Sequence, residues 1–95
     1  MTVITHHLKE GTWSIGNHAI KRMRERNISI PEIESVLERG SHNAKKDTKS
    51  DNGNWKYSVD GKTFDKRNLR ICLLFEGDMF IITVIDLDLS KGELL

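Results

Sequence analysis

The fold is decided by one stretch of the chain, Asn17-His18-Ala19-Ile20-Lys21-Arg22-Met23-Arg24-Glu25-Arg26-Asn27. At about 100° per residue its apolar side chains share one broad side of a helix that begins near Ser14 or Gly16, with Ser14 or Asn17 as the cap. Lys21 and Arg24 point the opposite way. A third stripe, made of His18, Arg22 and Arg26, runs along the margin of the apolar side. Side chains at such a margin are partly buried, so they need acceptors from the protein or from a bound anion.

A second helix is predicted directly after this stretch. Ser29 and Glu32 have the spacing of a capping box, and Pro31 is tolerated in a first turn. The apolar residues fall on one face, and they are Ile30, Ile33, Val36 and Leu37. Gly40 is the expected left-handed terminator. The sequence therefore predicts a helical hairpin with a very short connection.

Two β-hairpins are predicted in the second half of the chain. A short strand starts at Ser41–Ala44, and a polar loop runs to Asn54. Alternation over Trp55–Val59, with Asp60-Gly61 as a two-residue turn and a return at Lys62–Phe64, indicates the first hairpin. Strands Leu69–Glu76 and Met79–Asp86 around Gly77-Asp78 indicate the second.

The register of the second hairpin assigns its two faces. A two-residue turn places Glu76 opposite Met79, Cys72 opposite Thr83 and Arg70 opposite Ile85. One face is then continuously apolar and is the expected seat of the helices: Leu69, Ile71, Leu73, Phe75, Phe80, Ile82 and Val84. Arg70 and Thr83 point to the other face.

Length and composition bound the class of protein. The 95 residues make one α+β domain at 14–88, with an N-terminal extension at 1–13 and a tail at 89–95. Within the extension, Val3-Ile4 forms a short edge strand or a frayed end. The net charge of +1 excludes a protein that coats nucleic acid by bulk charge. The single cysteine, Cys72, and the absence of a signal-peptide pattern favour a cytoplasmic protein. The four histidines lack metal-ligand spacing, so we expect no metal and no cofactor.

The side chains of the stripe suit chemistry at a phosphate. A histidine exchanges protons near neutral pH, and arginine binds phosphate oxygens with paired hydrogen bonds. His18, Arg22, Arg70 and Thr83 therefore suit metal-independent RNA cleavage, in which the 2′-hydroxyl attacks the adjacent phosphate. Further substrate contacts are expected from three more side chains, Arg26, Tyr57 and Lys62, with Tyr57 stacking on a base.

Other interpretations of the same residues stay open. His18 is also typical of a capping or packing residue, and Arg22 and Arg26 are well placed to pair with Glu25, Glu34 or Glu38. The stripe equally suits a non-catalytic module that binds nucleic acid or a protein. Arg70 and Thr83 face away from the helices, so either the site wraps around a sheet edge, or the register is off by one, or the two features are separate.

The helical hairpin also carries a family resemblance. The run His18 to Ser29, with Ile33 to Gly40, Tyr57 to Gly61, Leu69 to Ile71 and Ile82 to Ile85, resembles the bacterial domain-of-unknown-function family numbered four-two-five-eight, over about residues 15–86. That family is similar to the RelE and BrnT toxins. The resemblance implies two helices on a four-stranded, mainly antiparallel sheet and a site at the positions of His18, Arg22, Arg70 and Thr83. It also implies a toxin-like endoribonuclease, or a degenerate relative, held by an antitoxin protein.

Two departures from the family pattern bear on the fold. Asn27 stands where the family often has Gly, but asparagine also tolerates the left-handed conformation that the corner requires. The stretch Lys45 to Asn54 is longer and more charged than the family pattern, which leaves the first strand of the sheet open.

Overall fold

A computed structural model describes residues 2–49 and 53–88 of the chain. The helices and strands of these ranges are α1 (Thr2–Glu10), β1 (Trp13–Ile15), α2 (Asn17–Arg26), α3 (Ile30–Arg39), β2 (Ser41–His42), the 3-10 helix η1 (Ala44–Lys46), β3 (Thr48–Lys49), β4 (Trp55–Lys62), β5 (Asn68–Glu76) and β6 (Asp78–Asp86). The α+β class is confirmed. The described part of the chain holds three α-helices and a mixed six-stranded sheet, rather than two helices and four strands.

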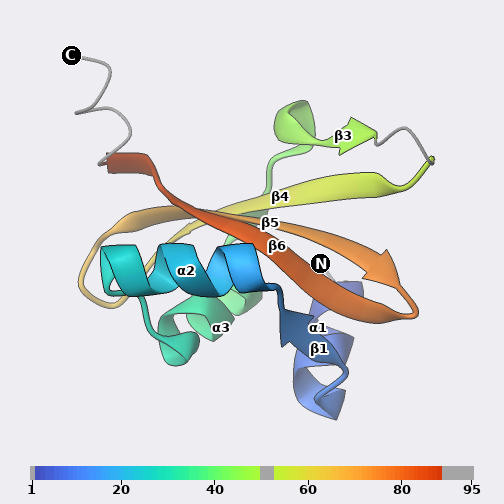
Figure 1. Ribbon diagram of the computed structural model, residues 1–95, viewed down its shortest axis with the longest axis horizontal. Coiled ribbons are helices and arrows are strands. Elements are labelled where there is room, and N and C mark those ends of the chain that lie inside the picture. The colour runs from blue at the N-terminus through green and yellow to red at the C-terminus, as the bar shows by residue number, and fades with distance from the viewer. Residues whose placement is uncertain (1, 50–52, 89–95) are drawn as a thin grey trace.

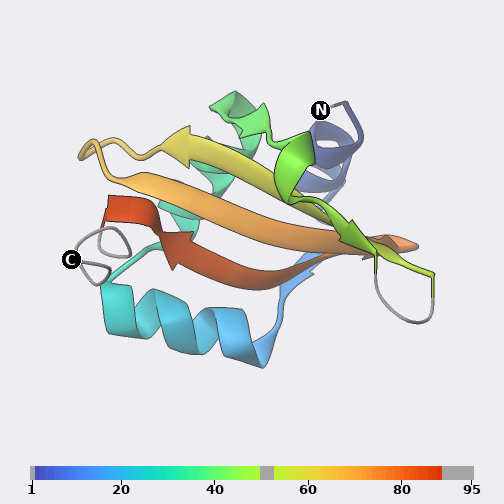
Figure 2. The ribbon, with the colours of Figure 1, turned by 90° about the horizontal axis from the view of Figure 1, so that it is seen from above.

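The sheet has the strand order β1-β6-β5-β4-β2, with β3 also paired to β4. β4, β5 and β6 are antiparallel, whereas β1 runs parallel to β6. The helices lie on one side of the sheet, and η1 with β3 lies on the other (Figure 1). Figure 2 shows α2 running alongside β6, at the sheet edge, with α3 behind the sheet. The core between sheet and helices is apolar, and its fully buried members include Ile4, Ile33, Leu37, Leu69, Ile71, Leu73 and Ile81.

The N-terminal segment is the main correction to the predicted fold. Val3-Ile4, predicted as a short edge strand or a frayed end, lies instead in the helix α1, which is followed by β1. Ile4 is completely buried in the core, and Leu8, one helical turn later, packs against the same core. The β-branched residues of this segment disfavour a helix locally, and burial of this apolar face overrides that preference.

The α2–α3 corner forms as its sequence predicts. Ser29 and Glu32 make both hydrogen bonds of the capping box, and Asn27 adopts the left-handed conformation at φ 53°. The cap of α2 differs, because Gly16 occupies it without a side-chain bond and Ser14 lies in β1.

Arg67, from the β4–β5 turn, ties this corner to the sheet. Its guanidinium donates to the carbonyl oxygens of Arg26 (2.8 Å) and Asn27 (3.1 Å), at the end of α2. It also forms an ion pair with Glu32 in the first turn of α3. Burial raises the pKa of Glu32, but the hydrogen bonds from Ser29 and Arg67 outweigh it and hold that pKa below its ordinary value. The sequence shows Arg67 only as one charge in a polar turn.

Gly40 and Gly61 form a close backbone contact that replaces the predicted Asp60-Gly61 turn. β4 continues through Gly61 to Lys62, and the chain reverses at residues 63–67. A Cβ on Gly61 would lie 3.0 Å from the Cα of Gly40 and 3.2 Å from a methyl of Val36. Glycine in a strand often marks such a close approach rather than a turn. Gly40 itself is extended (φ −74°, ψ 176°), not left-handed as predicted.

A β-bulge corrects the register of the final hairpin. Cys72 lies opposite Thr83 and Arg70 opposite Ile85, as predicted. Glu76 lies opposite Asp78 rather than Met79, because the register shifts between Cys72 and Leu73. The extra residue reverses which side chains of β6 face the helices between the bulge and the turn. Met79 and Ile81 are therefore buried, while Phe80, predicted to face the helices, is 37% exposed. The predicted tail, residues 89–95, lies outside the described residues.

Candidate functional site

A polar cavity of about 310 Å³ lies between α2 and the C-terminal half of β6. Its walls are formed by His18, Arg22, Arg26, Thr83, Val84, Ile85 and Asp86. The whole predicted helix stripe therefore faces one strand. Of the predicted site residues, the cavity brings together His18, Arg22, Arg26 and Thr83.

The position of α2 follows from a short parallel strand. β1 pairs only with Met79–Ile81 of β6, and the backbone N–H of Gly16 then donates to the carbonyl oxygen of Ile81 at 2.9 Å. This bond ends the strand and starts α2 beside the point where the pairing of β6 with β1 ends. Helix α2 then runs alongside β6 (Figure 2), and the two elements border the cavity, in which the β6 residues are Thr83–Asp86. Ala19 and Met23 anchor its apolar face in the core, which leaves the stripe at the border.

Thr83 reaches the cavity around the edge of the sheet. On β5, Leu69, Ile71 and Leu73 are buried in the core, so Cys72, which alternates with them, lies on the opposite face. Thr83 pairs with Cys72 and shares that outer face. Because α2 flanks β6 rather than lying under it, the stripe borders the cavity together with this outer face. The sequence leaves three arrangements open, and for Thr83 the structure shows the one in which the site wraps around a sheet edge.

The basic side chains of the cavity differ in their surroundings. His18 is exposed and has no hydrogen-bond partner among the described residues. Arg22 forms one exposed ion pair with Glu25 at 3.6 Å, and both side chains are 44% exposed. Such an ion pair contributes little to stability and leaves most of the guanidinium donors to a ligand. Arg26 is half-buried and already has an interaction of its own. Neither Glu34 nor Glu38 forms an ion pair with Arg22.

Asp86 is a wall residue that the sequence did not single out for the site. It lies at the end of β6, and it brings a carboxylate into a cavity otherwise dominated by cations. Asp86 pairs with Leu69, in the part of the hairpin where the predicted register holds, so alternation along β6 could have placed it on the face toward the helices.

Arg70 lies apart from the cavity. Its guanidinium grips Asp60 on the neighbouring strand β4 through two hydrogen bonds, of 2.8 and 3.0 Å. The amide of Asn43 donates to the same carboxylate at 2.9 Å. This cluster connects β5, β4 and the segment after β2, so its role is to stabilise the sheet.

The Asp60–Arg70 pair predicts a pH dependence of stability. The two hydrogen bonds from Arg70, assisted by Asn43, hold the pKa of Asp60 below its ordinary value of 3.8 despite partial burial. A carboxyl whose pKa is lowered by folding stabilises the protein above the unfolded-state pKa, and this contribution is lost as the pH falls through the folded-state pKa. Between about pH 5 and pH 3 the free energy of unfolding should therefore fall more steeply in the wild type than in Asp60→Asn. Urea titrations along this pH range measure both slopes, and equal slopes would contradict the assignment.

The remaining predicted substrate contacts also lie elsewhere. Tyr57 packs against the core, with its ring 5.8 Å from the rings of both His42 and Phe75. Lys62 is exposed at the end of β4, opposite Asn68. Neither lines the cavity beside α2.

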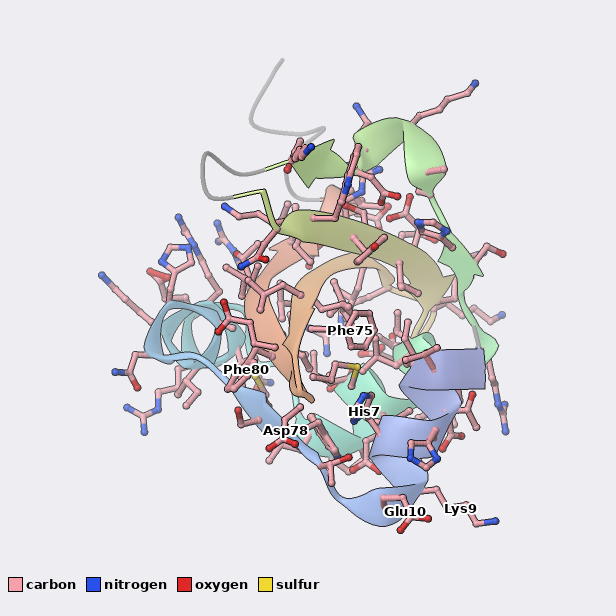
Figure 3. All side chains as sticks on the ribbon, turned by 90° about the vertical axis from the view of Figure 1, so that its right-hand side faces the viewer. His7, Lys9, Glu10, Phe75, Asp78 and Phe80 are labelled. Atoms are coloured by element: carbon pink, nitrogen blue, oxygen red, sulfur yellow. The ribbon has the colours of Figure 1, made fainter. Side chains whose placement is uncertain are left out.

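Two other histidines have packing partners. His7 lies under Phe75 (Figure 3), with ring centroids 5.5 Å apart, and its Nδ1 is 2.7 Å from the hydroxyl of Thr12. His42 pairs with Asp47 at 2.7 Å. In residues 2–49 and 53–88, no three His, Cys, Asp or Glu side chains come together as a metal site.

Comparison with known proteins identifies one family. A family model described as a domain of unknown function (DUF4258) matches residues 15–86, from the end of β1 to the end of β6. The matched range includes every residue of the cavity wall. No curated protein and no solved structure matches the chain. None of the described helices has the length and apolar character needed to cross a membrane.

Proposed function

Because the chain belongs to the DUF4258 family, whose function is unknown, we propose a function from the geometry of its cavity: metal-independent endoribonucleolytic cleavage of RNA. The observation that carries the proposal is the convergence of His18, Arg22 and Thr83 on one cavity from a helix and a strand far apart in the chain. The cavity offers a group that exchanges protons near neutral pH, a guanidinium and a hydroxyl.

Each side chain has a definite part in the proposed reaction. His18 takes the proton of the ribose 2′-hydroxyl, whose oxygen forms a bond to the adjacent phosphorus. The bond from phosphorus to the 5′-oxygen breaks, and that oxygen takes a proton from water. The products are a 2′,3′-cyclic phosphate and a 5′-hydroxyl. Arg22 neutralises the charge that accumulates on the phosphate oxygens, and the Thr83 hydroxyl donates to one of them.

The proposal gives roles at the cavity wall to Arg26 and Asp86, and none to Arg70 and Tyr57. Arg26 extends the positive wall of the cavity at its half-buried end. The structure places Arg70 and Tyr57 outside the cavity, so the mechanism does not use them. Asp86 disfavours a bound phosphate directly beside it, which directs the substrate backbone toward the His18 and Arg22 end.

A toxin-like role fits this chemistry. The similarity of the family to the RelE and BrnT toxins supports a small ribonuclease whose activity a partner antitoxin restrains. We include this role in the proposal, together with RNA as the substrate.

A second candidate is a module that binds RNA without cleaving it. The observation that favours it is the lack of an orienting partner for His18 among the described residues, because catalytic histidines are commonly oriented by a carboxylate or carbonyl. Catalytic hydrogen bonds also tighten on substrate binding, so this observation does not exclude the first candidate.

Exchange of Arg22 for glutamine tests the phosphate contact that both candidates share. We expect Arg22→Gln to weaken binding of a labelled single-stranded RNA and to reduce the slope of log Kd against log salt by about 0.7, one phosphate contact. Fluorescence anisotropy at several salt concentrations, in chelator, measures both quantities.

Lys21→Gln is the matched control, because Lys21 is the adjacent residue of α2, carries the same charge and does not line the cavity. It should leave the slope unchanged. Equal effects of both substitutions would assign binding to general surface charge, and the absence of binding in the wild type would refute both candidates.

A further inference from the structure

A second, larger groove lies on the opposite side of α2 from the cavity. It measures about 760 Å³ and is bordered by β1, α2 and the start of α3. Its lining is mainly apolar, with Trp13, Ile15, Ile20, Met23, Ile28 and Ile30 among its residues. Ile30 is 49% exposed, although it belongs to the apolar face of α3. Exposed apolar patches that form a groove typically mark protein–protein contacts.

One border of the groove is an unpaired sheet edge. β1 is the terminal strand of the sheet, with β6 as its strand partner among the described residues. The carbonyl of Thr12 and the N–H of Gly16 both point to β6, where they bond Met79 and Ile81. Because backbone groups alternate along a strand, those of Trp13 and Ile15 point the other way, toward the open edge. Edges of this kind accept an additional strand.

A positive charge stands at the rim of the same groove. Arg24 lines it, is exposed, and forms no ion pair with any described carboxylate. The neighbouring Glu25 is already paired with Arg22. A ligand that covers the apolar floor therefore gains by carrying a carboxylate opposite Arg24.

We infer that the groove is a docking site for an extended segment of a partner protein, which adds to the edge of β1 as a further strand. Its alternate side chains are apolar and lie beside Trp13 and Ile15, above Ile20 and Ile30. One acidic residue meets Arg24. The free backbone groups favour an extended partner over a helical one, because a helix leaves these N–H and C=O groups unbonded. The inference is independent of the proposed reaction, since the groove and the cavity share no lining residue.

Peptide display tests this docking mode on the full-length protein. The probe is a library of random twelve-residue peptides displayed on phage, followed by synthesis of the selected peptide with a fluorescein label. We expect selected sequences in which apolar residues alternate with polar ones, with an Asp or Glu near one end. Methylation of alternate peptide nitrogens should weaken binding about tenfold or more, because it removes strand hydrogen bonds and keeps the side chains.

Surface variants locate the binding site. Ile30→Lys and Arg24→Glu should each weaken binding about tenfold, and a peptide with Lys in place of its acid should recover affinity for Arg24→Glu. Val3→Lys is the control, because Val3 is a similarly exposed apolar residue (52%) on α1 that does not line the groove. Circular dichroism verifies that each variant is folded.

The alternatives give different results. Selected peptides with apolar residues at helical spacing, insensitive to backbone methylation, would assign the groove to a helix and overturn the inference. Concentration-dependent dimers that Ile30→Lys abolishes would assign it to a second copy. A protein that stays monomeric and selects no peptide has no docking site there.

Discussion

Gly40→Ala is expected to lower the free energy of unfolding by about 3 kcal/mol, at the upper end of the usual cost of overpacking. A Cβ on Gly40 would lie 2.4 Å from the carbonyl oxygen of Val36 and 2.6 Å from that of Asp60. Both atoms belong to backbone, so no side-chain rotation relieves the contact. The φ of Gly40 is −74°, which alanine adopts readily, so the cost is steric. Urea unfolding followed by circular dichroism measures it.

Substitutions at two other glycines provide a comparison for the cost of Gly40→Ala. Gly61→Ala should cost less, because its Cβ would meet the Cα of Gly40 at 3.0 Å and a movable Val36 methyl at 3.2 Å. Gly16→Ala should cost about 1 kcal/mol or less, since its Cβ would meet only the carbonyl oxygen of Ile81, at 3.3 Å. If Gly40→Ala were as stable as Gly16→Ala, the contact between α3 and β4 would be looser than described.

His18→Asn is expected to reduce the rate of RNA cleavage by about 10² to 10⁴-fold, the range that removal of a general acid or base produces. Asparagine keeps a polar side chain at an exposed helix position, so the fold should persist, but it exchanges no proton near neutral pH. Initial rates on a labelled RNA in chelator measure the effect. The products should carry a 2′,3′-cyclic phosphate, which mass spectrometry identifies.

Lys21→Ala, prepared in the same way, distinguishes this activity from a co-purifying nuclease. It should cleave like the wild type, because Lys21 does not line the cavity. Equal cleavage by the wild type and His18→Asn would remove His18 from the mechanism. Binding without cleavage in either protein would favour the non-catalytic module, and Arg22→Gln would then still weaken binding.

Local rules predicted the central helical hairpin well. The capping box at Ser29 and the left-handed Asn27 depend on interactions within a few residues, which sequence spacing records. The pairing of Cys72 with Thr83 was predicted by counting from a two-residue turn, whereas the structure has a turn one residue shorter. The prediction holds because the extra residue of the bulge restores the count. The bulge itself leaves no local signal, so the residues near the turn were assigned to the wrong faces.

Long-range contacts account for what the sequence did not show. Helix α1 exists because Ile4 is buried in a core assembled from distant strands. Gly61 resembled a turn residue, and its reason for being glycine is the backbone of Gly40, which comes close only after folding. Arg67 resembled an ordinary surface charge until its partners at the α2–α3 corner were known.

By itself, the sequence determined that His18, Arg22 and Arg26 share one margin of an amphipathic helix, because helical periodicity is a local property. Only the tertiary structure decided what that margin faces. The parallel pairing of β1 with Met79–Ile81 places α2 at the edge of β6, and this brings Thr83 and Asp86 to the stripe. The same pairing leaves the outer edge of β1 without a strand partner among residues 2–49 and 53–88, beside an apolar groove. Both features depend on which strands meet, which is settled by burial of the whole core rather than by the pattern of any one segment.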